Sequence, residues 1–161
     1  MTDLRTERLI LHPVDVGEAE RIAARRPAPG DAWAEDFPFE GDVMGVTMFL
    51  RATAAHGDQG PFGHYAIVRT ADGRAVGGAG FKGRPQAGSV EIGYGLAPSA
   101  RGHGYAAEAV RALLDLAREH GVARVVADTD RGNLASQRTL AAAGFARLGT
   151  DGDLLLYEVV L

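Results

Sequence analysis

The chain has 161 residues, a length that fits a single domain over residues 1–161. Its 17 basic and 21 acidic side chains give a formal net charge of −4 at pH 7, and it has no cysteine. The acidic balance argues against a nucleic-acid partner, and the lack of cysteine excludes disulfides, thiolate metal sites and a cysteine nucleophile. No run approaches the roughly 18 apolar residues of a membrane span and no signal-peptide pattern opens the chain, so we expect a cytoplasmic protein without membrane contact.

The first part of the chain predicts one strand, two helices and an irregular segment. Asp15 and Glu18 have the spacing of a capping box and predict the start of a first helix. Asp42 is expected to be the N-cap of a second helix. Between them, three prolines and three aromatic residues predict a packed segment without regular structure. The expected elements are a strand at 9–11, helices at 15–25 and 42–50, the irregular segment at 27–42 and a loop at 57–63.

The middle of the chain predicts an antiparallel meander, and the end predicts two further helices. Asp72-Gly73 indicates a two-residue hairpin turn in which both residues have a positive φ. The last meander strand, the following helix and the next strand form one βαβ crossover, so these two strands should pair in parallel. The expected elements are strands at 64–70, 75–82, 89–96, 124–128, 145–148 and 154–160, and helices at 104–120 and 133–143. The fold class is therefore α+β, with a mixed, mostly antiparallel sheet of about six to seven strands and about four helices.

Glycines at the start of the third helix indicate a phosphate-binding loop. Gly102 and Gly104 stand where a helix N-terminus offers unpaired N–H groups to an anion. Together with Ala107 they match the dinucleotide-binding fingerprint, and Asp128 follows at the distance of a ribose-binding acid. The meander and the short remaining chain do not fit the repeated βα units of that fold. A dinucleotide-binding protein is kept as an alternative.

A second interpretation rests on Arg101, Gly104 and Ala106, which resemble the R/Q-x-x-G-x-G/A pyrophosphate loop of the GNAT family of acyl-CoA-dependent N-acyltransferases. The order of elements from about residue 6 to 145 is also similar to that family. Asn133-Leu-Ala-Ser136, followed by Gly144-Phe145, resembles the subgroup that includes ribosomal-protein N-terminal acetyltransferases. The resemblance implies a GNAT-like domain that uses acetyl-CoA as co-substrate and needs no metal.

The resemblance also implies how the cofactor is held. In the family, the strand before the loop carries a bulge and splays from its neighbour, and Gly93 and Gly95 are where we expect that bulge. Loop N–H groups would bind the pyrophosphate, although His103 and Tyr105 also fit a solvated histidine and a packed tyrosine. Asn133 is expected both to cap its helix and to face the cofactor. The implied cofactor-binding residues are Leu96, Ala97, Arg101, Gly102, His103, Gly104, Tyr105, Ala106, Asn133 and Ser136.

Amine acylation needs a proton acceptor, an oxyanion donor and an acid for the thiolate. Glu91 is the expected base, directly or through water, because its side chain takes the opposite face from its apolar neighbours; an exposed strand glutamate is the alternative. A backbone N–H near Leu96 would stabilise the oxyanion. The family's usual tyrosine is Leu140 here, so Ser136 or water is expected to protonate the thiolate. Without cysteine, we expect direct transfer in a ternary complex.

The acceptor side is expected at Trp33, Glu35, Asp36 and Tyr94, where acids among aromatic rings suit a cationic amine. The alternative is a surface acid pair beside core aromatics, and Glu35 or Asp36 could also be the base. The expected function is transfer of an acetyl group to a primary amine of a small molecule or a peptide N-terminus. An acyl-CoA-binding sensor without turnover is a further alternative, based on Leu140. Edge strands are compatible with a homodimer, and His64 is expected in the core or at its rim.

Overall fold

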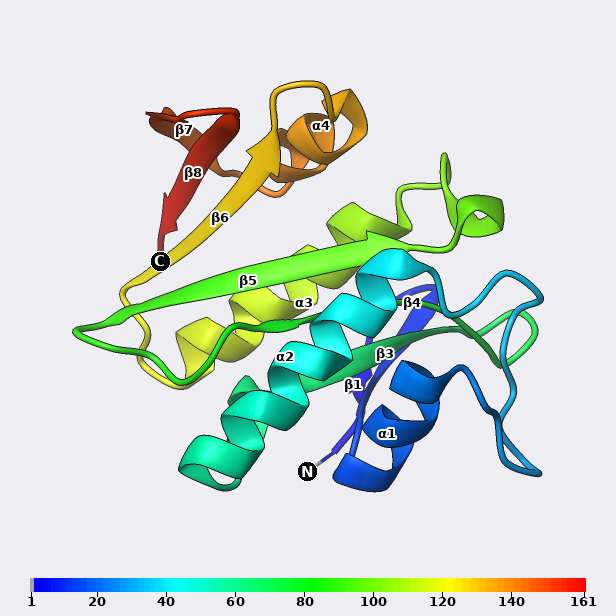
Figure 1. The fold of residues 1–161 in the computed structure, drawn as a ribbon. Coiled ribbons are helices and arrows are strands. Elements are labelled where there is room, and N and C mark those ends of the chain that lie inside the picture. Colours follow the sequence, from blue (N-terminus) through cyan, green and yellow to red (C-terminus); the bar gives the residue numbers. More distant parts are fainter. Residues whose placement is uncertain (1) are drawn as a thin grey trace.

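The computed structural model describes residues 2–161, which form one open sheet with helices on both faces (Figure 1). The strand order is β1-β2-β3-β4-β5-β6-β8-β7, and β5 with β6 is the one parallel pair among the described strands. The strands are β1 (Leu4–Arg5), β2 (Leu9–Pro13), β3 (His64–Arg69), β4 (Arg74–Phe81), β5 (Ser89–Leu96), β6 (Arg124–Asp130), β7 (Ala146–Asp151) and β8 (Leu154–Val160). The helices are α1 (Val16–Ala24), α2 (Glu40–His56), α3 (Tyr105–Glu119) and α4 (Leu134–Ala142), with 3-10 turns at Gly60–Phe62 and Pro98–Ala100.

The predicted α+β class and the parallel β5/β6 pair are confirmed. Over residues 2–161 the sheet has eight strands, one more than the upper expectation, because β1 has two residues and is too short to show an alternating pattern. No helix in this part of the chain is long and apolar enough to cross a membrane, and no group of three or more potential metal ligands occurs in it.

Helix starts follow the capping chemistry, with one correction. At α1 the predicted box is present: the Asp15 side chain accepts the Glu18 N–H at 2.8 Å, and the Glu18 carboxylate accepts the Asp15 N–H. At α2 the N-cap is Phe39, and Asp42 lies three residues inside the helix. Its Oδ2 accepts the Phe39 N–H at 2.8 Å. The expected N-cap at Asp42 is therefore wrong, because an acid in the first turn satisfies a terminal N–H from within the helix.

The two turns of the meander differ in geometry. Arg69 pairs with Arg74, which leaves a four-residue loop in which Gly73 has φ +69° while Asp72 does not have a positive φ. The predicted two-residue turn at Asp72-Gly73 is wrong. That geometry occurs at Ala87 and Gly88, with φ of +52° and +77°, where the flanking residues exchange two backbone hydrogen bonds.

The helices divide the two faces of β5 between them. In Figure 1, α1 and α2 cover one face of the sheet and α3 crosses the other. Val90 and Ile92 are buried in the core together with Val110 and Leu113 of α3. Because side chains alternate along a strand, Glu91 and the glycines that follow it point to the α2 side. This alternation produces two different surfaces on one strand.

Candidate functional site

The sheet opens between β5 and β6. Their parallel pairing is limited to Ser89–Glu91 of β5 opposite Arg124–Val126 of β6, after which the strands diverge (Figure 1). From Ile92 to Leu96 the β6-facing edge of β5 has no strand partner among the described residues, because β6 pairs along its length with β8. The expected splay is present. Its unpaired main-chain groups can bind an extended ligand as an added strand would.

The expected bulge at Gly93 and Gly95 is not present. β5 pairs with β4 in an unbroken register from Ile92 to Leu96. The close backbone approach lies instead at Gly77 of β4, where a Cβ would stand less than 2.5 Å from the carbonyl oxygen of Gly95. The splay therefore arises because β6 pairs with β8 along its length, and it does not require an extra residue in β5.

The loop before α3 presents a row of free hydrogen-bond donors. Gly102 and Gly104 have φ of +84° and +80°, a backbone conformation that side chains other than glycine rarely adopt. The backbone N–H groups of residues 102–107 form no hydrogen bond within residues 2–161. They stand at the N-terminus of a 15-residue helix, where the helix dipole adds a partial positive charge. The arrangement suits a diphosphate.

Arg8, between β1 and β2 near the N-terminus, contacts this loop and the first turn of α3. Its guanidinium donates to the His103 carbonyl oxygen at 2.7 Å and to Glu108 Oε1 at 2.8 Å, and it lies 4.7 Å from the centre of the Tyr105 ring. Glu108 also accepts the Thr6 hydroxyl and the Arg8 N–H. Burial alone would raise the pKa of Glu108, but these hydrogen bonds hold it below its usual value. Sequence analysis missed this contact, since the partners are about a hundred residues apart.

A second contact joins α4 to β5 across the opening between β5 and β6. Asn133 caps α4 as predicted, with Oδ1 accepting the Ser136 N–H at 3.1 Å. The Ser136 hydroxyl lies 2.7 Å from the Tyr94 hydroxyl of β5. Burial raises the pKa of Tyr94. Leu140 of α4 is fully buried.

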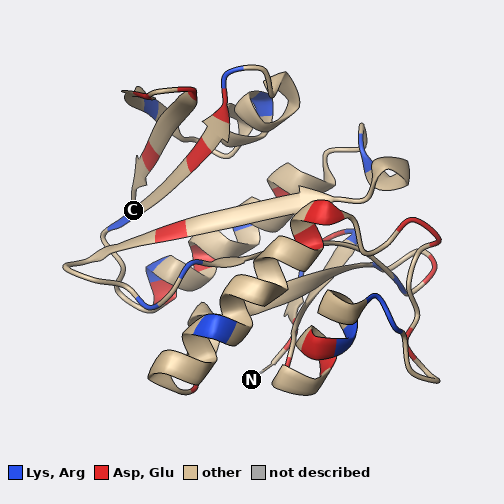
Figure 2. Cartoon of the chain, in the orientation of Figure 1, with Lys and Arg blue, Asp and Glu red and all other residues tan. Residues whose placement is uncertain are grey.

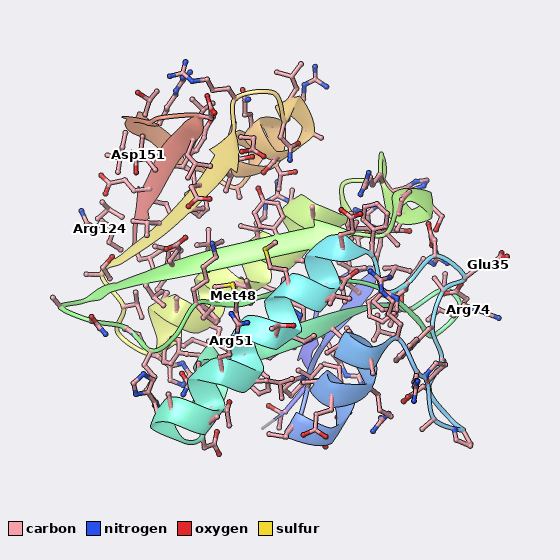
Figure 3. All side chains as sticks on the ribbon, viewed as in Figure 1. Glu35, Met48, Arg51, Arg74, Arg124 and Asp151 are labelled. Carbon is pink, nitrogen blue, oxygen red and sulfur yellow. The ribbon has the colours of Figure 1, made fainter. Side chains whose placement is uncertain are left out.

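A groove of about 1170 Å³ lies on the α2 side of the opening. Figure 2 shows acidic residues on β5 and β6 and a basic residue within α2, and Figure 3 shows Met48 and Arg51 projecting from that helix. Apolar, charged and glycine surfaces therefore meet in one groove. Its walls include Met44, Met48 and Arg51 of α2, Gly78 and Gly80 of β4, Glu91, Gly93, Tyr94 and Gly95 of β5, Asp128 of β6 and Ser136 of α4.

Among the expected acceptor and base residues, Glu91 and Tyr94 line the groove. The Glu91 carboxylate lies 2.9 Å from Lys82 Nζ. Glu35 is exposed and projects from a loop at the edge of the molecule (Figure 3). The structure thus separates Glu35 from Glu91 and leaves Glu91 ion-paired.

Asp36 and Trp33 also lie outside the groove walls. Asp36 accepts the Ser99 N–H at 2.8 Å and the Ser99 hydroxyl at 2.7 Å, and these hydrogen bonds lower its pKa. Trp33 packs edge-on against Phe37, 5.4 Å between ring centres, at a separate small pocket. This geometry gives Asp36 a role in holding the segment that leads into the 102–107 loop.

Two further polar residues at the groove were not among the expected site residues. Asp42 is a buried residue in the first turn of α2, and burial raises its pKa to about 6. His64 lines the groove, and burial lowers its pKa to about 4. The expectation of a core or rim position fits the location of His64. Neither residue has a sequence signal for function, since an acid in a first helical turn and a histidine at a strand start are both common.

A family model of the acetyltransferase (GNAT) domain matches residues 8–146. The chain belongs to the GNAT acetyltransferase family. The uncharacterised N-acetyltransferase YjdG of Bacillus subtilis (strain 168) is 40% identical over 87 residues, which cover 52% of this chain and 51% of that protein. The match thus spans about half the length of this relative.

Solved GNAT structures share the fold over almost the whole chain. Mycobacterium smegmatis RimJ in complex with CoA-disulfide is 26% identical, with a TM-score of 0.63, and the match covers 94% of this chain and 81% of that one. The ribosomal-protein-S5-alanine acetyltransferase of Vibrio fischeri is 17% identical, with a TM-score of 0.70 and coverage of 99% and 97%. The dinucleotide alternative is wrong for this GNAT fold, because the described sheet has one parallel pair instead of repeated βα units.

Proposed function

We propose that the protein is an acetyl-CoA-dependent N-acetyltransferase that moves the acetyl group directly to a primary amine of a small molecule or a peptide N-terminus. This proposal rests on two stretches of backbone that have no hydrogen-bond partner in the described residues. One is the row of six free N–H groups at the start of α3, and the other is the unpaired edge of β5. A diphosphate fits the first and a pantetheine chain fits the second. The RimJ structure with CoA-disulfide supports this assignment.

The two unpaired stretches of backbone indicate which residues bind the cofactor. Residues 102–106, including the exposed His103 and the half-buried Tyr105, contribute N–H groups at the pyrophosphate, whereas the Arg101 N–H is bonded to the Pro98 carbonyl oxygen. Leu96 and Ala97, at the end of β5, contact the pantetheine. Asn133 and Ser136 approach its sulfur end from α4.

In the transfer step the amine nitrogen attacks the thioester carbonyl carbon, a C–N bond forms and the C–S bond breaks. A backbone N–H near Leu96, on the unpaired edge of β5, stabilises the oxyanion. The Tyr94–Ser136 pair, 2.7 Å between hydroxyl oxygens, protonates the leaving thiolate. Because this pair supplies the hydroxyl that Leu140 lacks, an enzyme is favoured over a sensor without turnover.

Among the carboxylates expected as the base, Glu91 is the one that lines the groove, where it is ion-paired with Lys82. Asp128 is the other carboxylate in this lining, which also contains Arg51 and Arg84. Met44 and Met48, which are 66% and 41% exposed, add an apolar surface for the rest of the acceptor.

The proposal is tested by thermal shift with acetyl-CoA, CoA, NAD and NADP. A ligand at a hundred times its Kd stabilises a protein by about 2.7 kcal/mol, so we expect a rise in Tm with the CoA species alone. Thiol release is then followed with a panel of primary amines: tetrapeptide amides with free N-termini, spermidine, free amino acids and kanamycin. A rise with NAD or NADP alone would contradict the proposal, as would acetyl-CoA binding without transfer to any amine.

The cytoplasmic location and a homodimer through the edge strands β1 or β7 stay predictions. Light scattering of the purified protein with and without acetyl-CoA tests the second.

A further inference from the structure

One oxygen of a buried carboxyl, that of Asp42 in the first turn of α2, has no role in the fold or in the transfer described so far. Asp42 is 3% exposed. Its Oδ2 accepts the Phe39 N–H, whereas Oδ1 has no hydrogen-bond partner in the described part of the chain. A buried polar atom without a partner costs about 1–3 kcal/mol of stability. Such a group calls for a functional explanation.

The His64 ring lies next to this carboxyl, in a space that three glycines leave open. A Cβ would stand 2.7 Å from ring Cε1 if placed on Gly45 of α2, and 2.6 Å from Nε2 if placed on Gly78 of β4. On Gly80 it would stand 3.1 Å from Nδ1. The ring is therefore enclosed between α2 and β4, and it lines the groove.

The His64 ring and the Asp42 carboxyl both lie near the position that a Cβ on Gly78 would occupy. The Cβ position of Gly78 is 2.6 Å from His64 Nε2 and 3.1 Å from Asp42 Oδ1. Gly78 pairs with Gly95 of β5, so this point is one strand away from the edge at which the thioester is proposed to lie.

We propose that His64 is the base that takes the proton of the acceptor amine, and that Asp42 is a positioning residue that acts through the His64 ring. This inference rests on the proposed function. As the nitrogen attacks the thioester carbon, its N–H bond breaks and the proton goes to the imidazole. The C–S bond breaks at the same centre and the thiolate takes a proton from the Tyr94–Ser136 pair. His64 then releases its proton to water, the Tyr94–Ser136 pair regains a proton from water, and Asp42 stabilises the transient imidazolium while it exists.

The charged groups in the groove favour His64 over Glu91 as the base. The Glu91 carboxylate is held in an ion pair with Lys82 Nζ at 2.9 Å. Burial keeps the His64 ring neutral, so that a ring nitrogen has a free lone pair at pH 7, and it raises the pKa of Asp42 to about 6. The other charged groups around the pair are Arg25 and Arg101, which favour ionised Asp42, and along the groove Arg51, Lys82, Arg84, Glu91 and Asp128, together with the imidazole of His56.

The test compares His64→Gln and Asp42→Asn with wild type, Glu91→Gln and the control His12→Gln, whose ring is ion-paired to Asp3 and Glu18. The probe is the first amine of the panel that wild type acetylates. We expect kcat to fall at least about 100-fold in H64Q and about 10-fold in D42N, and less than 10-fold in E91Q. In D42N the acid limb of the pH profile moves to lower pH, because the carboxylate no longer favours the imidazolium.

The Kd for acetyl-CoA, measured by calorimetry, should stay within twofold of wild type in both variants, and H12Q should behave as wild type. A kcat within threefold of wild type in H64Q overturns the assignment. So does an equal loss of acetyl-CoA affinity in H64Q and D42N, because it would place the pair in the cofactor site. If wild type itself transfers acetyl to no amine of the panel, the proposed function fails first and this assignment fails with it.

Discussion

Asp42 and His64 oppose each other in the pH dependence of stability. The pKa of Asp42 is raised to about 6 in the folded protein from an ordinary value of 3.8, so its ionisation destabilises the fold as the pH rises through this window. The pKa of His64 is lowered to about 4 from 6.5, so its protonation destabilises the fold as the pH falls through that window. Each shift corresponds to about 3 kcal/mol.

The two effects separate in single variants. Relative to wild type, Asp42→Asn should gain Tm between pH 4 and 7, because it removes a carboxylate that must ionise while buried. His64→Gln should gain Tm from pH 6.5 down to pH 4, because it removes a ring that must protonate while buried. The expected gain is roughly 2–4 °C per kcal/mol. Scanning calorimetry across this pH range checks both; parallel Tm curves for a variant and wild type would contradict the assigned burial effect.

Tyr94 and Ser136 should act as one unit. We expect Tyr94→Phe and Ser136→Ala each to lower kcat about tenfold, since either change breaks the path that carries a proton to the thiolate. The double variant should lose little more than each single variant, because groups acting as a unit are not additive. Steady-state kinetics at saturating acetyl-CoA measures this, with calorimetric Kd values for CoA as the control. Losses that multiply in the double variant would show two independent roles.

At the scale of elements, the start of α3 depends on the segment between β1 and β2. Thr6 and Arg8 bond to Glu108, and Arg8 also holds the His103 carbonyl oxygen. These contacts turn the loop carbonyl inward and leave the N–H groups free to face a ligand. The N-terminal strands thus orient a loop that belongs to the opposite half of the chain.

Arg8→Ala should therefore raise the KM for acetyl-CoA about tenfold, because the loop loses the contact that orients its donors. The KM for S-acetylpantetheine, which has no diphosphate, should not change, and kcat at saturation should stay near wild type. Arg124→Ala is a matched control, since it removes an ion pair with Glu158 far from the loop (Figure 3). An equal rise in KM for both thioesters would mean that Arg8 supports the fold and not the diphosphate site.

At the scale of the whole molecule, the sheet consists of two halves joined by little main-chain pairing. Three residues of β5 pair with three of β6, and the Tyr94–Ser136 contact bridges the far end. A cofactor bound along β5 would fill the opening and link the halves. Binding should then stabilise the region around the opening more than the rest of the sheet.

Hydrogen exchange tests this directly. With acetyl-CoA, amides of residues 92, 94 and 96, which face the unpaired edge of β5, and of residues 102–107 should exchange at least tenfold more slowly, because they gain hydrogen-bond partners, while β2 and β3 should change little. NAD at the same concentration serves as the control. Slowing that is uniform along the chain, or confined to β7 and β8, would place the cofactor elsewhere.

Local sequence patterns predicted most of the elements and the resemblance to the family, although they missed β1 and the start of α2. Local patterns decide these features: alternation predicted the meander, Asp15 with Glu18 predicted the α1 cap, and the glycines at 102 and 104 predicted the loop, since a positive φ there needs glycine. The two wrong local predictions, the N-cap at Asp42 and the turn at Asp72-Gly73, concern residues that are compatible with two local geometries. In both cases the arrangement of the neighbouring elements selects one of the two.

Only the tertiary structure decided which side chains meet. Arg8 with His103, Tyr94 with Ser136, and Asp42 with His64 join residues that are between 22 and 95 positions apart. Burial, which raises the pKa of Asp42 and lowers that of His64, depends on what α2 covers and not on the residue type. The sequence therefore showed where the cofactor loop lies, whereas the packing of α2 on the sheet decided which polar groups surround the acceptor.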